Sequence, residues 1–85
     1  MKEYIDKIAD ELNSDERVCK VDLHSFDSGA YMIDVWTKNH FYCLQLFNGE
    51  FGMSKIDDNV DFSSIPDTIF KTYEDFMSNL RRELT

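Results

Sequence analysis

The sequence is poor in the residues that define several classes of small protein. Its 85 residues include one proline, three glycines and two cysteines. So little proline and glycine excludes a collagen-like or low-complexity chain. Two cysteines without CxxC spacing supply neither a disulfide framework nor a zinc motif. We therefore expect Cys19 and Cys43 to be reduced, partly buried thiols.

Long apolar runs and basic residues are also scarce. No segment approaches the ~20 apolar residues of a membrane span, and the first twelve residues carry acids where a signal peptide is apolar. Nine bases stand against 17 acids, a net charge of −8. This balance argues against direct nucleic-acid binding and against anionic membranes. We expect a cytoplasmic protein whose field steers a basic partner; alternatively, the acidity only maintains solubility.

What the chain does contain is enough apolar sequence for one small core, since 42% of its residues are hydrophobic. Helical spacing over residues 2–12 lines up Met1, Ile5, Ile8 and Leu12. The same spacing near the C-terminus lines up Tyr73, Phe76, Met77, Leu80 and Leu84. Thr72 is placed to cap that second helix, with Asp75 three residues on. A helix is therefore predicted at each end of the chain.

Between the helices the apolar residues alternate, which predicts strands. Residues 27–29 predict a three-residue turn with Gly29 left-handed, residues 38–39 a two-residue turn, and Asn48 with Gly49 a type I′ turn. These turns set a register that pairs Leu23 with Ile33, Ile33 with Leu44, and Leu44 with Met53. We predict a single α+β domain over residues 1–85, with a four-stranded antiparallel meander in the order α-β-β-β-β-α. Residues 69–70 form either a short edge strand or a helical turn.

The register divides the strand residues between two faces of the sheet. The core face receives Cys19, Val21, Leu23, Tyr31, Ile33, Val35, Tyr42, Leu44, Leu46, Phe51 and Met53. The other, which we call the second face, receives Lys20, Asp22, His24, Met32, Asp34, Trp36, Phe41, Cys43, Gln45, Phe47, Glu50, Ser54 and Ile56.

Aromatic and charged residues are mixed on the second face. Asp22 falls opposite Asp34, and directly opposed like charges are unfavourable in a sheet. Lys20 falls opposite Trp36, where it can pack on the indole. Aromatic side chains around a carboxylate pair are typical of a binding surface. Three interpretations follow: one of the chain's own helices covers this face, a homodimer buries it, or a foreign partner binds it.

No catalytic or cofactor-binding motif is present. The chain lacks a phosphate-binding glycine loop and a nucleophile elbow. His24 falls near Asp22 and Asp34, but a catalytic metal site generally needs three protein ligands. A predicted strand separates His24 from Cys43, which disfavours a Cys–His pair. We expect a surface histidine, no metal, no cofactor and no enzymatic activity.

Residues 57–67, which we call the acidic loop, hold four acids and no base. Asp57, Asn59 and Asp61 have the spacing of an EF-hand, but Phe62 stands where glycine is needed and Thr68 where glutamate is needed. Calcium is therefore disfavoured. The loop is either a solvated turn-rich segment or an anionic surface for lysine and arginine of a partner.

The C-terminal 40% of the chain resembles small acidic immunity proteins of bacterial toxin systems. The resembling residues are Gly52-Met53-Ser54-Lys55, Asp57, Asp58, Asp61-Phe62-Ser63, Pro66-Asp67 and Ile69-Phe70. The resemblance implies a protein that binds and neutralises a cognate toxin, often a basic nuclease domain, in the producing cell. It transfers no individual binding residue.

These observations predict a non-catalytic inhibitor that occludes the active site of a basic toxin domain. The predicted partner-binding residues are Asp22, Met32, Asp34, Trp36, Phe41, Phe47, Asp57, Asp58 and Asp61. Two alternatives remain: an acidic DNA mimic that inhibits a nucleic-acid enzyme, and a homodimeric adaptor.

Overall fold

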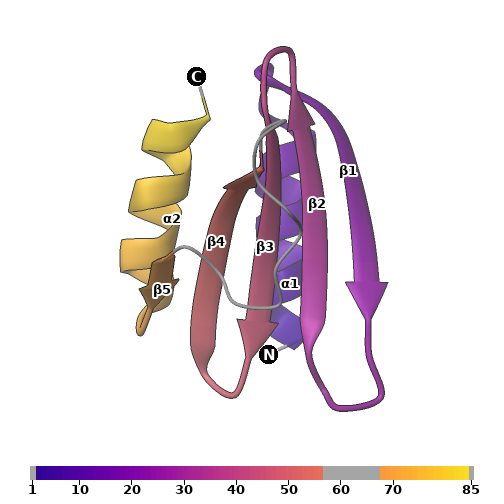
Figure 1. Ribbon diagram of the computed structural model, residues 1–85, viewed down its shortest axis with the longest axis vertical. Coiled ribbons are helices and arrows are strands. Elements are labelled where there is room, and N and C mark those ends of the chain that lie inside the picture. The colour runs from indigo at the N-terminus through magenta and orange to yellow at the C-terminus, as the bar shows by residue number, and fades with distance from the viewer. Residues whose placement is uncertain (1, 57–67, 85) are drawn as a thin grey trace.

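The computed structural model describes residues 2–56 and 68–84. Its elements follow in the order α1 (Lys2–Asn13), β1 (Val18–Ser25), β2 (Tyr31–Thr37), β3 (Phe41–Phe47), β4 (Glu50–Ile56), β5 (Thr68–Phe70) and α2 (Tyr73–Glu83). The predicted α+β class, with a helix at each end and an antiparallel sheet between them, is confirmed (Figure 1). The whole acidic loop, and with it the predicted binding residues Asp57, Asp58 and Asp61, lies outside the described residues.

The sheet has five strands rather than the four predicted. Each strand pairs antiparallel with its neighbour in the chain, so the order in the sheet is β1-β2-β3-β4-β5. The fifth strand is the short segment whose structure the sequence left open, and it pairs Phe70 with Phe51 of β4. Three residues are too few to show an alternating pattern, which is why periodicity could not decide between strand and turn.

The turns fix the register as predicted. Gly29, Asn48 and Gly49 all have positive φ, at 91°, 54° and 80°. Two successive positive-φ residues match the right-handed twist of the flanking strands, as a type I′ turn requires. Leu23 pairs with Ile33, Ile33 with Leu44 and Leu44 with Met53. The assignment of side chains to the two faces of the sheet therefore holds over most of the meander.

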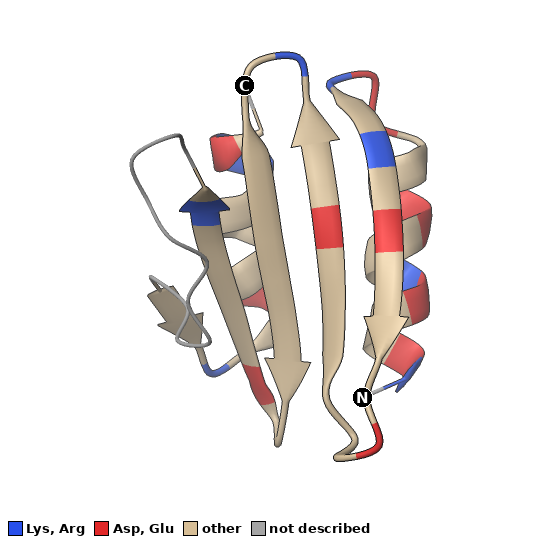
Figure 2. Ribbon diagram, turned by 45° about the vertical axis from the view of Figure 1, so that its right-hand side comes forward, with Lys and Arg blue, Asp and Glu red and all other residues tan. Residues whose placement is uncertain are grey.

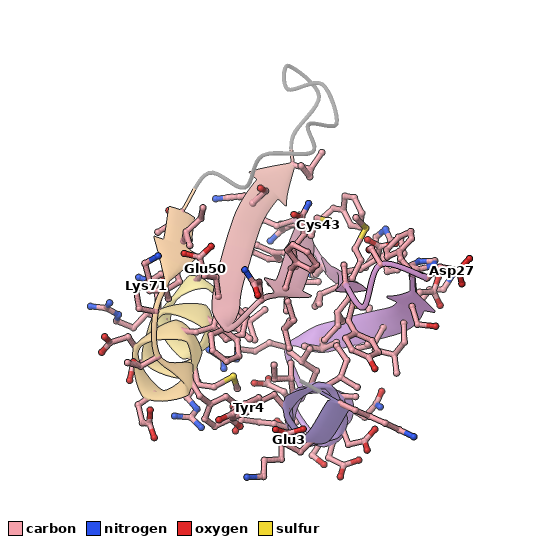
Figure 3. The ribbon with its side chains drawn as sticks, turned by 90° about the horizontal axis from the view of Figure 1, so that it is seen from below. Glu3, Tyr4, Asp27, Cys43, Glu50 and Lys71 are labelled. Atoms are coloured by element: carbon pink, nitrogen blue, oxygen red, sulfur yellow. The ribbon has the colours of Figure 1, made fainter. Side chains whose placement is uncertain are left out.

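Both helices pack on the core face of the sheet (Figure 3). The Thr72 hydroxyl accepts a hydrogen bond from the Asp75 amide and begins α2, as predicted. The buried core consists of Ile5, Ile8, Leu12, Ile33, Val35, Tyr42, Leu44, Leu46, Phe51, Met53, Phe76, Met77, Leu80 and Leu84. The Tyr42 hydroxyl donates to the carbonyl oxygen of Glu83 at 2.7 Å, so the polar atom of this buried ring is satisfied.

Two residues predicted to lie in the core do not. Cys19 is exposed, because the pairing of β1 with β2 shifts register between Val18 and Lys20. Such a bulge places an extra residue in one strand and turns its side chain away. Leu23 keeps its predicted side but is 50% exposed, since β1 is an edge strand with β2 as its single neighbour.

The helices are short relative to a bilayer. Within residues 2–56 and 68–84, neither one is long and apolar enough to cross a membrane.

Candidate protein-binding face

The second face lies opposite both helices. α1 runs behind the sheet in Figure 1, α2 lies beside β4 and β5, and the view along the strands in Figure 3 places both helices on the core face. Among the described residues no helix covers the second face. Neither α1 nor α2 therefore buries the second face, contrary to the first of the three interpretations.

Cross-strand pairing arranges the second face in rows. The aromatic row contains Lys20, Trp36, Phe41 and Ile56. The acidic row contains Asp22, Asp34, Cys43 and Ser54. A third row contains His24, Met32, Gln45, Gly52 and Ile69. Phe47 pairs with Glu50 at the end of the sheet formed by the β3–β4 turn.

The side chains of the aromatic row pack against one another. The rings of Trp36 and Phe41 stack with centroids 4.8 Å apart and planes at 26°. Lys20 Nζ lies 4.9 Å from the centre of the Trp36 ring, within the range of a cation–π contact. Trp36 and Phe41 are each only partly exposed. The predicted packing of Lys20 on Trp36 is confirmed.

The acidic row carries two carboxylates on adjacent strands, visible as red segments side by side on β1 and β2 in Figure 2. Each has a neighbour that offsets their repulsion. Lys20 Nζ lies 3.6 Å from Asp22 Oδ2, and Nε2 of the exposed His24 lies 2.9 Å from Asp34 Oδ2. Each carboxylate of the row therefore has its own polar neighbour, Lys20 for Asp22 and His24 for Asp34.

Cys43 continues the acidic row into the sheet. Burial raises the pKa of its thiol to about 11, and the charge of Asp34 together with a hydrogen bond to it acts in the same direction. The thiolate is the nucleophilic form, so Cys43 is a weak nucleophile at neutral pH. His24 lies on β1 and Cys43 on β3, with β2 between them as predicted. Within the described ranges, no three His, Cys, Asp or Glu side chains gather where they could hold a metal ion.

Phe47 marks the most apolar end of the second face. Its side chain is 51% exposed, and those of Phe26 and Ile69 are 49% and 48% exposed. A hollow of about 270 Å³ lies on one side of Phe47, towards Phe26 and Met32. A second, of about 150 Å³, lies on the other side, towards Glu50 and Ile69. Gly52, which has no side chain, lines the second hollow.

Of the predicted binding residues, the structure brings Asp22, Met32, Asp34, Trp36, Phe41 and Phe47 together on the second face. Phe26 and Ile69 were missed. Phe26 continues the even-numbered alternation of Lys20, Asp22 and His24 by one more step, so a longer reading of that pattern would have found it. Ile69 depends on the pairing of β5 with β4, which the sequence did not decide.

The sequence and the fold were also compared with known proteins. No protein-family model, no curated protein and no solved structure matches the chain.

Proposed function

We propose that this protein is a non-catalytic inhibitor that binds another protein, and that it acts as an immunity protein against a basic toxin domain. The observation that carries the proposal is the second face, a sheet surface opposite both helices that combines exposed apolar side chains with a pair of carboxylates. Exposed apolar patches on small proteins commonly mark contact surfaces.

The size of the hollows favours a protein partner over a small molecule. Pockets for small ligands usually enclose ~300–1,000 Å³ and bury most of the ligand. The hollows beside Phe47, at about 270 and 150 Å³, are smaller and open. Each suits a single side chain from a larger surface.

The charge of the chain favours a basic partner. Its net charge is −8, and the acidic row places Asp22 and Asp34 beside the apolar part of the second face. Complementary charge mainly accelerates association and selects the partner, whereas buried aromatic anchors carry most of the affinity. Inhibition would follow by occlusion, with carboxylates meeting the cationic substrate site of a nuclease-like domain. The bacterial cytoplasm, where such a toxin is made, is the compartment that this proposal implies.

Co-expression tests the proposed function. The protein encoded beside this one should be toxic when produced alone in a bacterial host, and harmless when this chain is produced with it. Leu23→Ala should protect as well as the natural chain, because Leu23 lies on the other side of the sheet. A neighbouring protein that is harmless alone, or that stays toxic in the presence of this chain, would refute the toxin assignment.

The DNA-mimic alternative has weaker support from the described acids. A mimic needs carboxylates along a continuous track, as phosphates lie along a duplex. Figure 2 instead shows acidic residues along the outer side of α1 and, separately, on β1 and β2. Basic residues lie within or beside both groups, namely Lys2 and Lys7 in α1 and Lys20 in β1.

A further inference from the structure

Trp36 is the largest side chain on the second face, but both of its neighbours there are side chains of the same protein. One side of the indole stacks on Phe41 at 4.8 Å. Lys20 Nζ lies over the ring at 4.9 Å. A partner that used Trp36 as an anchor would have to displace these contacts, and it would then recover only part of the interaction.

Phe47 differs from Trp36 in each of these respects. It is 51% exposed and is the last residue of β3, the central strand of the sheet. It stands between two hollows, and the larger one is lined mainly by apolar side chains, including Phe26, Tyr31 and Met32. An incoming apolar side chain could pack against the Phe47 ring from either side without moving a residue of this protein.

Carboxylates flank this end of the sheet. Asp27 lies in the β1–β2 turn and Glu50 begins β4, and Figure 3, which looks onto this end of the strands, shows the two residues on opposite sides of it. Glu50 forms an ion pair with Lys71, but the Lys71 side chain is 77% exposed and the Glu50 side chain 41% exposed. Exposed ion pairs contribute little free energy, so a cation from a partner can compete for Glu50.

We propose that the partner of the second face docks on its Phe47 end, by inserting an apolar side chain beside Phe47 while adjacent lysine or arginine residues meet Asp27 and Glu50. This inference takes the nature of the partner, a basic protein, from the proposed function, whereas the place where the partner docks follows from the second face alone. It makes Phe47, and not Trp36, the centre of the binding surface.

A pair of short peptides tests the recognition chemistry directly. The probes are a capped arginine–phenylalanine–arginine tripeptide and a capped glutamate–phenylalanine–glutamate tripeptide, titrated separately into the full ¹⁵N-labelled chain. The basic probe should shift the amide resonances of Phe26, Met32, Gln45 and Phe47. It should bind at least ~5-fold more tightly than the acidic probe, and added salt should narrow that difference.

Matched variants separate the two parts of the site. Phe47→Ala should reduce the affinity for the basic probe ~5-fold or more, whereas Leu23→Ala should leave it unchanged. Leu23 is the matched control because it is 50% exposed but lies on the opposite side of the sheet. The double change Asp27→Asn with Glu50→Gln alters no apolar contact. It should preserve binding of both probes but remove the preference for the basic one.

Three results would overturn the inference. They are equal binding of the two probes, shifts centred on Trp36 and Lys20, and equal effects of Phe47→Ala and Leu23→Ala. Absence of binding by either probe counts as the first of these. None of these results depends on a toxin. The peptide titration and the co-expression experiment can therefore fail independently of each other.

Discussion

At the scale of single residues, the two cysteines show how burial decides chemistry. Cys19 and Cys43 both lie on strands that the alternation of apolar residues predicts. A register shift turns Cys19 outward, whereas Cys43 is only 6% exposed. The sequence could not predict this difference, because Cys19 continues the alternation of Val21 and Leu23 and no residue type marks the position of the bulge.

Thiol reactivity should follow that difference. In the native protein, Ellman's reagent should titrate Cys19 rapidly and Cys43 very slowly, since Cys43 is buried and its pKa is raised to about 11. In denaturant both thiols should react. Cys19→Ser is the control and should remove the rapid phase. Two rapid thiols in the folded protein would contradict the placement of Cys43.

For the candidate site, the sequence predicted which face of the sheet most of the described residues lie on, but not how exposed each side chain is. Alternation placed Asp34, Trp36 and Phe47 on one face correctly. The register also predicted that Lys20 packs on Trp36, but it could not show that Trp36 stacks on Phe41 whereas Phe47 is 51% exposed. Exposure depends on neighbours in three dimensions, and period-2 patterning carries no information about it.

At the scale of elements, the β3–β4 hairpin links the fold to the candidate site. Its type I′ turn contains Asn48 and Gly49 at positive φ, and it places Phe47 opposite Glu50. The turn was predictable because few residue pairs tolerate that conformation. The fifth strand was not predictable, because its three residues are too few to show an alternating pattern. The face on which the helices pack was not either, because both faces of the meander carry apolar residues.

Gly49→Ala should destabilise the hairpin. Gly49 has a φ of 80°, and a Cβ there would meet no atom within 4 Å, so the cost is conformational rather than steric. We expect the free energy of unfolding to fall by about 1 kcal/mol, measured by urea denaturation. Ser28→Ala, in the β1–β2 turn, is the control and should change it little. An unchanged midpoint for Gly49→Ala would contradict the type I′ turn.

At the scale of the whole molecule, charged contacts link the two helices over the core face. The Arg81 guanidinium donates to both carboxylate oxygens of Glu11 at 2.8 Å, and Arg17 donates to the Arg81 carbonyl oxygen at 2.9 Å. Hydrogen bonding to Arg81 lowers the pKa of Glu11 below its ordinary value of 4.5. These contacts tie α1 to α2 on the core face, on the side of the sheet away from the second face.

The Glu11–Arg81 pair should give stability a defined dependence on pH. Because the folded-state pKa of Glu11 is lowered, its contribution is present above the unfolded value of 4.5 and is lost as the pH falls through the folded value. Glu11→Gln should therefore lower the free energy of unfolding by roughly 0.5 kcal/mol at pH 7, since the bridge is partly exposed. Thermal unfolding from pH 3 to 7 should show the gap closing below pH ~4.5. Exposed Glu16→Gln is the control, and a gap that persists at pH 3 would contradict the assignment.

Calorimetric titration of the purified chain against the protein encoded beside it tests whether a partner binds the second face at Phe47. We expect one-to-one binding, weakened by at least ~2 kcal/mol in Phe47→Asp, as for a central interface anchor. Leu23→Asp, equally exposed on the other side of the sheet, should bind as the natural chain does. Loss of binding in Leu23→Asp with full binding in Phe47→Asp would place the partner on the wrong side of the sheet and contradict the account.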